Sequence, residues 1–419
     1  MDATGDMMTE MGARARRAAA AMREASTAQK NAALLKASAL IKESEADILA
    51  ANAAEIEAAK NDGRSGAFID RMTLNAERID GICAALQTIA SLDDPVGKII
   101  AETRRPNGLA ISRIRTPIGV IAVIYESRPN VTVDAAAIAL KAGNAVILRG
   151  GSECIATNRA LHQCMRAACH AAGLPEDAAQ FVDTPDRAAV GALLSGLDGA
   201  IDLVIPRGGK SLVARVQSDA RAPVLSHLDG VCHVYIDGAA DPEKAVAIAL
   251  NSKMRRPGVC GAAETLLIDM AARELYAPVA AALRDAGCEI RDDGTIREWD
   301  PDAAPASDED FYTEYLAPVI SVAGVDGVEG AITHIAKYSS GHTEAIVTED
   351  AAAASEFLAR IDSAIVLHNA STQFADGGEF GLGAEIGIAT GRLHARGPVG
   401  VEELTTYKNV VRGDGQIRP

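Results

Sequence analysis

The stretch at residues 119–149, GVIAVIYESRPNVTVDAAAIALKAGNAVILR, carries the pattern that decides the fold. A short apolar run at residues 119–125 predicts a buried strand, and residues 133–142 predict a helix that Gly143 ends. Residues 145–148 predict a second strand. Two strands joined by a helix indicate a parallel, doubly wound sheet, which binds ligands at the carboxyl ends of its strands.

The same alternation continues toward the C-terminus. Further strands are predicted at residues 180–182, 203–205, 231–237, 265–269, 289–291, 318–322 and 344–348. Helices are predicted at residues 153–172, 187–194, 241–256, 273–287, 328–337 and 351–361. On the N-terminal side, residues 8–60 predict two long amphipathic helices and residues 69–92 a further helical pair. A chain of 419 residues with this pattern predicts an α/β protein of two or three domains.

One segment interrupts the alternation. Residues 98–115 contain Pro106-Asn107-Gly108 between two runs in which apolar and polar residues alternate. Asn-Gly between such runs is typical of a β-hairpin. The C-terminal run LTTYKNVVRG alternates in the same way. We therefore expect a protruding β-hairpin here rather than an element of a core.

The net charge limits the kinds of molecule that the protein can bind, and the cysteines indicate its compartment. The formal net charge of −16 disfavours nucleic acids and membrane surfaces, because both are polyanionic. Residues 1–16 lack the apolar region of a secretory signal, and no run approaches the roughly 20 apolar residues that span a bilayer. The seven cysteines form no C-x-x-C pair, so we expect reduced thiols in the cytoplasm and no metal site.

Among these cysteines, Cys260 has the neighbours of a reactive thiol. Cations precede it in residues 253–256 (KMRR) on a predicted helix, Pro257-Gly258 turns the chain, and residues 262–264 predict a short helical turn. Cations and helix-start N–H groups stabilise a thiolate, the nucleophile that attacks an acyl carbon. The alternative is a small buried thiol, the commoner state, to which the other six cysteines are assigned.

The segment RPGVCGAAETLL at residues 256–267 resembles the catalytic-cysteine segment of the γ-glutamyl phosphate reductases, a branch of the aldehyde dehydrogenase superfamily. The resemblance runs in order from about residue 10 to the C-terminus. It includes the blocks PIGVIAVIYESRPNVTVDAAAIALKAGNAVILRGGSE, DLVIPRGGKSLV, SHLDGVCHVYID, SGHTEAIVTED, EFGLGAEIGIAT and LHARGPVGVEELTTYK. One departure is Gly261, where the family usually has Asn, and it puts the tightness of this turn in doubt.

The resemblance implies an α/β, aldehyde dehydrogenase-like fold with two doubly wound parallel-sheet domains and a small β extension for oligomerisation. The cofactor-binding domain is assigned residues 1–97, 116–230 and 370–392. The catalytic domain is assigned residues 231–369. The extension is assigned residues 98–115 and 393–419. Because its strand edges would otherwise be unprotected, we expect it to mediate self-association into a homo-oligomer.

The resemblance also implies roles for single residues. Cys260 would be the nucleophile, and Asn130 in SRPNVT would stabilise the oxyanion together with a backbone N–H group. Arg149 stands where the superfamily has a Lys at the adenosine ribose, and its forked guanidinium suits a 2′-phosphate, which favours NADPH. The other residues assigned to the cofactor are Ser152, Glu153, Arg207, Gly208, Gly209, Lys210 and Glu314. The residues assigned to the glutamate head of the substrate are Asn369, Ser371 and Thr372.

His227 marks a difference from the hydrolytic aldehyde dehydrogenases. In the superfamily pattern, a Glu general base stands where this sequence has His227 in LSHLDGVCHV. Without that carboxylate we expect no activation of water, so a thioester on the cysteine would not be hydrolysed to the free acid. His227 itself is interpreted as a packing residue without a catalytic role.

Together these features imply an NADPH-dependent enzyme that reduces L-glutamyl 5-phosphate to L-glutamate 5-semialdehyde through a thioester on Cys260, the second step of proline biosynthesis. Two alternatives stay open. An acyl-CoA reductase or another acylating aldehyde dehydrogenase would share the cysteine but use a different leaving group. A non-catalytic partner of glutamate 5-kinase would have lost the nucleophile or the cofactor residues, and neither loss is seen. A reductase in complex with that kinase is a further expectation.

Overall fold

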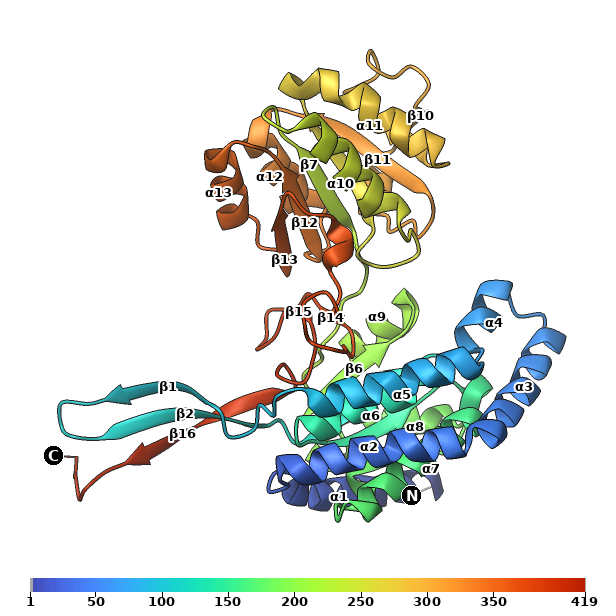
Figure 1. Cartoon of the computed structure of the whole chain (residues 1–419), viewed down its shortest axis with the longest axis vertical. Helices are drawn as coiled ribbons and strands as arrows, with labels where there is room; N and C mark the ends of the chain where they lie inside the picture. Colours follow the sequence, from blue (N-terminus) through green and yellow to red (C-terminus); the bar gives the residue numbers. More distant parts are fainter. Residues whose placement is uncertain (1–2, 419) are drawn as a thin grey trace. The chain divides into compact units, whose positions relative to one another are not determined.

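The computed structural model describes residues 3–418 and divides them into two compact units (Figure 1). The first unit comprises residues 3–226, 381–387 and 399–418. The second comprises His227–Phe380 and Ile388–Pro398. Among the helices of residues 3–418, none combines the length and the apolarity that crossing a bilayer requires.

The N-terminal part of the first unit is helical. Its helices are α1 (Ala3–Met22), α2 (Thr27–Glu43), α3 (Glu45–Asn61), α4 (Gly66–Met72) and α5 (Ala76–Ser91). The sequence predicted two long helices over residues 8–60, whereas the structure has α1, α2 and α3 there, because Ser26 and Ser44 interrupt the helical pattern. Ser26 forms a capping box with Gln29 at the start of α2.

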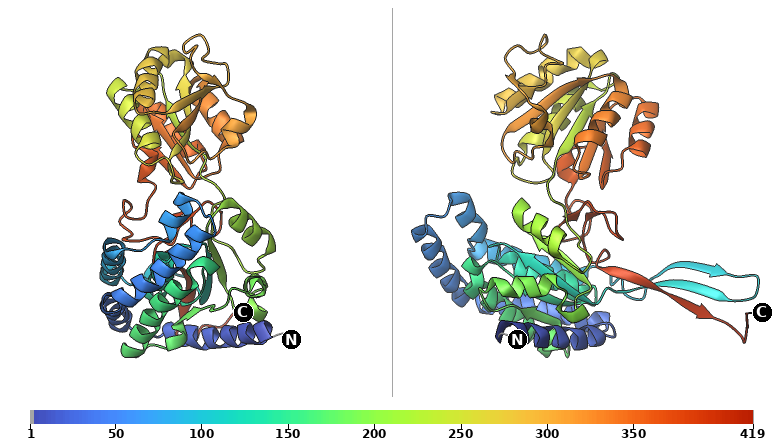
Figure 2. Two further views of the ribbon diagram at one scale, coloured as in Figure 1. Left: turned by 90° about the vertical axis from the view of Figure 1, so that its right-hand side faces the viewer. Right: turned by 180° about the vertical axis from the view of Figure 1, so that it is seen from behind.

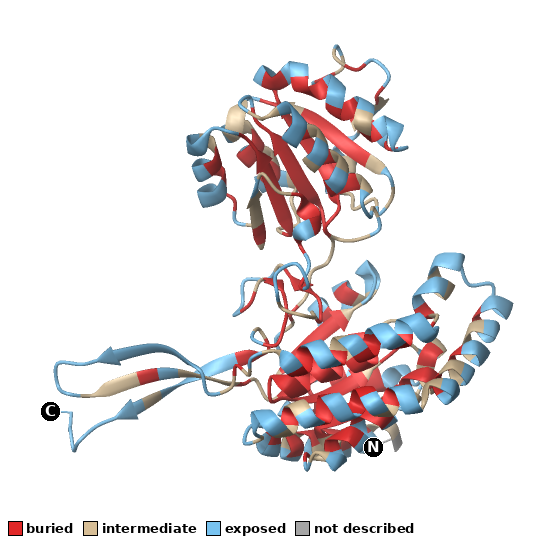
Figure 3. Cartoon of the chain, in the orientation of Figure 1, coloured by how far each residue is buried: buried red, intermediate tan, exposed pale blue. Residues whose placement is uncertain are grey.

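Helix α1 packs against a parallel sheet with the strand order β5-β4-β3-β6. The strands are β3 (Val120–Tyr125), β4 (Ala145–Arg149), β5 (Ala179–Phe181) and β6 (Leu203–Arg207). The connecting helices are α6 (Asn130–Lys141), η1 (Ser152–Cys154), α7 (Ile155–Ala171), η2 (Glu176–Ala178), α8 (Arg187–Leu194), η3 (Leu197–Gly199) and α9 (Lys210–Asp219). Every residue of β3 is buried, as in a sheet with both faces covered (Figure 3). The strand–helix–strand prediction for residues 119–149 is confirmed.

The predicted hairpin is also confirmed, and the C-terminal run joins it. Strands β1 (Ile99–Arg104), β2 (Ala110–Pro117) and β16 (Thr405–Arg412) form an antiparallel sheet with the order β1-β2-β16. Gly108 has a φ of +90° in the hairpin turn, a conformation that glycine adopts without strain. Figures 1 and 2 show these strands as a ribbon that extends from the body of the first unit, and we call it the β extension.

The second unit is built on a parallel sheet with the order β10-β9-β11-β8-β7-β12-β13. Its strands are β7 (Cys232–Ile236), β8 (Ala263–Asp269), β9 (Glu289–Asp292), β10 (Ala304–Pro305), β11 (Val319–Val325), β12 (Thr343–Val347) and β13 (Ile365–His368). Its helices are α10 (Pro242–Met254), η4 (Met270–Ala272), α11 (Arg273–Asp285), η5 (Asp308–Tyr312), α12 (Gly327–Tyr338), α13 (Ala351–Arg360) and η6 (Thr372–Phe374). A separate antiparallel pair joins β14 (Ile388–Ala389) and β15 (Gly397–Pro398). The two larger apolar clusters of this unit pack around the sheet, so the predicted α/β fold with two parallel sheets is confirmed.

The structure differs from the sequence analysis at two places near Cys260. The helical turn predicted at residues 262–264 is wrong, because β8 begins at Ala263 and is buried along its whole length between β7 and β11. Pairing in the middle of a sheet here outweighs local helix propensity. The compact units also divide the C-terminal region differently, since residues 370–380 and 388–398 group with the second unit.

Candidate active site

Cys260 lies in the turn between α10 and β8. The backbone N–H of Ala262 donates to the carbonyl of Val259 at 2.9 Å and tightens this turn. The cysteine is half-buried and packs against a small apolar cluster that includes Ile365 and Ile388. The thiol is therefore neither sealed in the core nor fully exposed, which a nucleophile requires.

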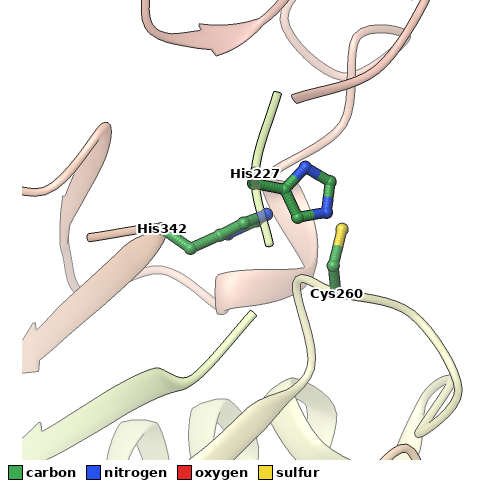
Figure 4. A group of neighbouring side chains, drawn as sticks. All are labelled: His227, Cys260 and His342. Atoms are coloured by element: carbon green, nitrogen blue, oxygen red, sulfur yellow. The ribbon is translucent and has the colours of Figure 1, made fainter. Parts of the chain in front are cut away.

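Two histidines share this place with the thiol. One ring nitrogen of His227, one of His342 and the sulfur of Cys260 all lie within 4.8 Å of one another (Figure 4). The grouping follows from the sheet, because His227 precedes β7, Cys260 precedes β8 and His342 precedes β12. These strands are neighbours and run parallel, so their amino ends meet at one edge. We call these three residues the His–Cys–His cluster.

His227 is oriented by the backbone. Its Nδ1 lies 2.7 Å from the carbonyl oxygen of Ile388. A carbonyl only accepts, so Nδ1 carries a proton and the neutral ring has its lone pair on Nε2. Figure 4 shows a ring nitrogen of His227 turned toward the Cys260 sulfur. One ring nitrogen of His227 therefore lies within 4.8 Å of the Cys260 sulfur, a neighbour that the interpretation of His227 as a packing residue did not anticipate.

His342 is fully buried beside it. Its Nδ1 lies 2.8 Å from Oγ1 of Thr343 and 3.5 Å from Sγ of Cys232. Its Nε2 is buried and has no hydrogen-bond partner among the described residues. Burial lowers the pKa of His342 to about 3, so the ring is neutral at neutral pH. The rings of His342 and His227 meet edge to face, with centroids 5.2 Å apart.

Small residues around the thiol allow close backbone packing. A Cβ at Gly230 would lie 2.1 Å from the carbonyl oxygen of Cys260, so a larger residue is excluded there. That carbonyl accepts a hydrogen bond from Sγ of Cys232 at 3.2 Å. Burial raises the pKa of the Cys232 thiol well above its ordinary value, so this second thiol stays protonated. At Gly261, a Cβ would lie 3.1 Å from the carbonyl oxygen of Thr372, a contact that an Asn relieves only by a small shift of its neighbours.

The three cations that precede the thiol differ in burial. Helix α10 ends at Met254, and Arg255 and Arg256 are exposed beyond it. Lys253 is fully buried and forms an ion pair with Glu264. Its charge is therefore paired with a buried carboxylate, and a role of the three cations in activating the thiol stays a prediction.

In the first unit, the residues assigned to the cofactor meet at one edge of the sheet. Arg149 ends β4, Arg207 ends β6, and Asn130 begins α6 after β3, so all follow carboxyl ends of neighbouring parallel strands. Glu126 connects them, because its backbone N–H donates to the carbonyl of Arg207 and its carboxylate accepts from the N–H of Gly209, both at 2.9 Å. Sequence analysis missed Glu126, although its place directly after β3 was a signal.

The remaining residues assigned to the cofactor lie in the first unit, except Glu314. Ser152 and Glu153 form η1, where Glu153 accepts from Ser127 and Arg64, both at 3.0 Å. Gly208 and Gly209 are exposed, and Lys210 opens α9. Glu314 is half-buried in the second unit, between η5 and β11.

The residues assigned to the substrate head lie near the end of β13. The amide of Asn369 already bridges the backbone N–H and carbonyl of Thr348, at 3.0 and 2.9 Å. Ser371 is buried and accepts from Ser252 at 3.2 Å. Thr372 is buried, and its Oγ1 has no hydrogen-bond partner among the described residues. Substrate binding by these residues stays a prediction.

Comparisons with known proteins identify the family. A sequence model of the aldehyde dehydrogenase family matches residues 1–291. A γ-glutamyl phosphate reductase of Rhizorhabdus wittichii is 60% identical over 416 residues, which cover 99% of this chain and 96% of that protein. The chain belongs to the aldehyde dehydrogenase family, on its γ-glutamyl phosphate reductase branch. The resemblance stated from the sequence blocks is thus confirmed.

Solved structures of the family agree with the fold. The crystal structure of a γ-glutamyl phosphate reductase from Thermotoga maritima is 44% identical, with a TM-score of 0.96, over 98% of this chain and 100% of that one. An acetylating aldehyde dehydrogenase from Geobacillus thermoglucosidasius is 19% identical, with a TM-score of 0.69, over 99% of this chain and 98% of that one. The second likeness concerns the fold alone and shows how widely this architecture is shared.

Proposed function

We propose that this protein reduces L-glutamyl 5-phosphate to L-glutamate 5-semialdehyde and phosphate with NADPH, through a thioester on Cys260. Its membership of the γ-glutamyl phosphate reductases makes it an enzyme of proline biosynthesis. The observation that carries the proposal is the half-buried thiol with a ring nitrogen of His227 turned toward it. A thiol beside an imidazole is a pair that carries out acyl transfer.

In the acyl-transfer step, the thiol proton of Cys260 moves to Nε2 of His227 and the sulfur attacks the acyl carbon. The new C–S bond gives a tetrahedral oxyanion. As this intermediate collapses, the bond between the carbonyl carbon and the phosphate oxygen breaks, and phosphate leaves with that electron pair. The phosphate takes up the proton from His227 directly or through water, so the imidazole returns to its neutral form. No water-activating carboxylate is needed in this sequence.

Asn130 is the proposed side-chain donor to the oxyanion. It is exposed at the start of α6, and its Nδ2 donates one hydrogen bond to Asp134 at 2.9 Å. The amide has a second N–H, because Asn carries two donors on Nδ2. A fixed donor of this kind stabilises the charge that develops on the carbonyl oxygen.

The edge of the first unit's sheet has features that fit an anionic dinucleotide. The Nε atom of Arg149 is buried and has no hydrogen-bond partner among the described residues. Its N–H group can therefore donate to an acceptor on a ligand. A Cβ at Gly208 would lie 2.7 Å from the Glu126 side chain, so only glycine leaves this approach open. When bound, NADPH would supply the hydride that reduces the thioester to the aldehyde.

We assign the binding of that cofactor to the residues at this edge. Arg149 would hold the 2′-phosphate, and Arg207, Lys210 and the N–H groups of Gly208 and Gly209 would hold the pyrophosphate. Ser152 and Glu153 complete the set at this edge, and the superfamily pattern assigns the nicotinamide ribose to Glu314. The carboxylate of Glu126 occupies the Gly209 N–H at 2.9 Å and would turn away as an anion arrives.

The covalent step is tested by replacing the nucleophile. We expect Cys260→Ser to lower reduction of L-glutamyl 5-phosphate by at least roughly 10³-fold, because a hydroxyl is a far weaker nucleophile. Without NADPH, the wild type releases one phosphate per chain and gains the mass of a glutamyl group, whereas the variant does neither. Cys288→Ser is the control, since that thiol is buried elsewhere in the second unit.

The same assay separates the alternatives. Wild-type protein is offered the acyl phosphate and the corresponding CoA thioester side by side, with NADPH or NADH. Turnover of the CoA thioester alone would overturn the proposed substrate, and equal rates with both dinucleotides would overturn the preference for NADPH. Full activity of Cys260→Ser would exclude the thioester.

A further inference from the structure

The His–Cys–His cluster has the composition of a metal site as well as that of a nucleophile with its partner. We propose that His227, Cys260 and His342 bind a thiophilic divalent cation, Zn²⁺, and that its binding withdraws the thiol from catalysis. The cluster offers two imidazole nitrogens and one sulfur, and these are the ligands that zinc prefers in proteins.

The geometry is close to what zinc requires. The three ligand atoms already lie within 4.8 Å of one another. A tetrahedral zinc with Zn–N of about 2.0–2.1 Å and Zn–S of about 2.3 Å places such atoms roughly 3.4–3.6 Å apart. Side-chain rotations that move each ligand atom by about 1 Å or less therefore complete the site. Three protein ligands leave the fourth position open, as in zinc sites that exchange their fourth ligand.

The hydrogen-bond contacts of both imidazoles also support a zinc site. The carbonyl oxygen of Ile388 accepts from Nδ1 of His227 at 2.7 Å, an outer contact that directs Nε2 toward a metal. In His342, Nδ1 lies 2.8 Å from Oγ1 of Thr343, while Nε2 is buried without a partner among the described residues. Leaving a buried polar atom unpaired is costly, and a metal ion would pair it.

The ligands of the cluster favour zinc over Mg²⁺ and Ca²⁺, and they include the thiol of Cys260 but not that of Cys232. Among the described residues it contains no carboxylate, so the oxygen ligands that Mg²⁺ and Ca²⁺ require are missing. The thiol of Cys232 donates to the Cys260 carbonyl and is not one of the cluster's ligands. Cys260 is half-buried, so the residue that carries the sulfur ligand is not sealed in the core.

Binding of zinc has a direct chemical consequence. The ion displaces the proton of the Cys260 thiol, which is released to solvent, and takes up a lone pair of the sulfur. That sulfur then no longer attacks an acyl carbon, so zinc competes with the acyl phosphate. The loss of activity, unlike the binding itself, rests on the proposed function of Cys260.

Binding is measured on the whole purified chain after removal of metals with a chelator. We expect calorimetry to show one Zn²⁺ per chain, and Co²⁺ in its place to show the sulfur-to-metal absorption band of a thiolate ligand. Alkylation of Cys260 by iodoacetamide, followed by mass spectrometry, should slow at least roughly 10-fold with zinc and recover with the chelator. Unchanged alkylation in saturating zinc would overturn the site.

Variants assign the ligands. We expect His227→Gln and His342→Gln each to weaken zinc binding at least roughly 10-fold, since each removes one of three ligands. His334→Phe and Cys288→Ser are controls, because they alter an imidazole and a thiol of the second unit that are not ligands of the cluster, and both should keep the wild-type affinity. Wild-type affinity in both glutamine variants would overturn the proposal, and if His342→Gln fails to fold, His227→Gln and the Co²⁺ spectrum still decide. Zinc that protects Cys260 without slowing turnover would overturn the proposed nucleophile and not the site.

Discussion

The histidines of the second unit illustrate how surroundings set the chemistry of a single residue. His227 has its ring fixed by a backbone carbonyl, and His342 is fully buried with one nitrogen unpaired among the described residues. His334 lies against the rings of Phe311 and Tyr338, with centroids 5.0 and 4.5 Å away. An imidazole titrates near neutral pH unless its environment opposes the charge, and burial does so for His342 and His334, lowering the pKa of each to about 3.

His334 provides a prediction about acid stability. Burial lowers its pKa to about 3, whereas an unfolded chain has a histidine pKa of about 6.5. Between these values the unfolded state binds a proton that the folded state does not. The stability contributed by the neutral ring is therefore complete above pH of about 6.5 and is lost as the pH falls toward 3.

We expect the free energy of unfolding to fall by up to roughly 2 kcal/mol through this group between pH values of about 7 and 5. His334→Phe should lose this part of the pH dependence, because a phenyl ring fills the same space without titrating. Urea unfolding of both proteins at the two pH values measures it. Identical pH dependence in variant and wild type would show that His334 is protonated in the folded state.

At the scale of elements, a buried ion pair joins α10 to β8 on either side of the cysteine turn. Lys253 and Glu264 are both fully buried, and Glu264 also accepts from the backbone N–H of Leu316 at 3.4 Å. Burial raises the pKa of Glu264 to about 7, and the charge of Lys253 opposes that rise. The pair therefore fixes the end of the helix against the start of the strand and with them the turn that carries Cys260.

A double-mutant cycle tests this link. We expect Lys253→Met alone to lower the free energy of unfolding by about 3–5 kcal/mol, because it leaves a buried carboxylate without its partner. Lys253→Met combined with Glu264→Gln should recover much of that loss, since no charge is then buried. Urea unfolding of the four proteins gives the coupling. Simple additivity of the two single changes would contradict the expected coupling.

At the scale of the whole molecule, the β extension leaves large apolar side chains exposed in the single chain. Its outer strands expose large apolar residues, among them Ile99 at 56% and Val411 at 54%. In the order β1-β2-β16, both β1 and β16 have an edge that pairs with no other described strand. Open edges with apolar side chains favour pairing with another chain. We therefore propose that the extension mediates self-association.

This proposal predicts a change in mass in solution. The wild type should behave as an oligomer in light scattering, and Ile99→Lys combined with Val411→Lys should shift it toward the monomer, because charges at the strand edges oppose pairing. Leu358→Lys is the control, an exposed apolar position at 42% on α13 of the second unit. A monomeric wild type, or the same shift with the control, would contradict a role for the extension.

The sequence by itself determined the order of strands and helices, the hairpin and the family. Periodicity, caps and turn residues are local properties, so the run at residues 119–149 and the Asn107-Gly108 turn predicted what the structure shows. Local pattern failed at residues 262–264, where pairing in the middle of a sheet converts a helical sequence into β8.

Only the tertiary structure decided what surrounds Cys260. Of the cations beside it in the sequence, Lys253 is buried and paired with Glu264. His227 and His342 are distant in the sequence but near in space. They meet the thiol because β7, β8 and β12 are parallel neighbours whose amino ends share one edge. No local pattern encodes which strands become neighbours, since that depends on how the whole sheet buries its apolar surface.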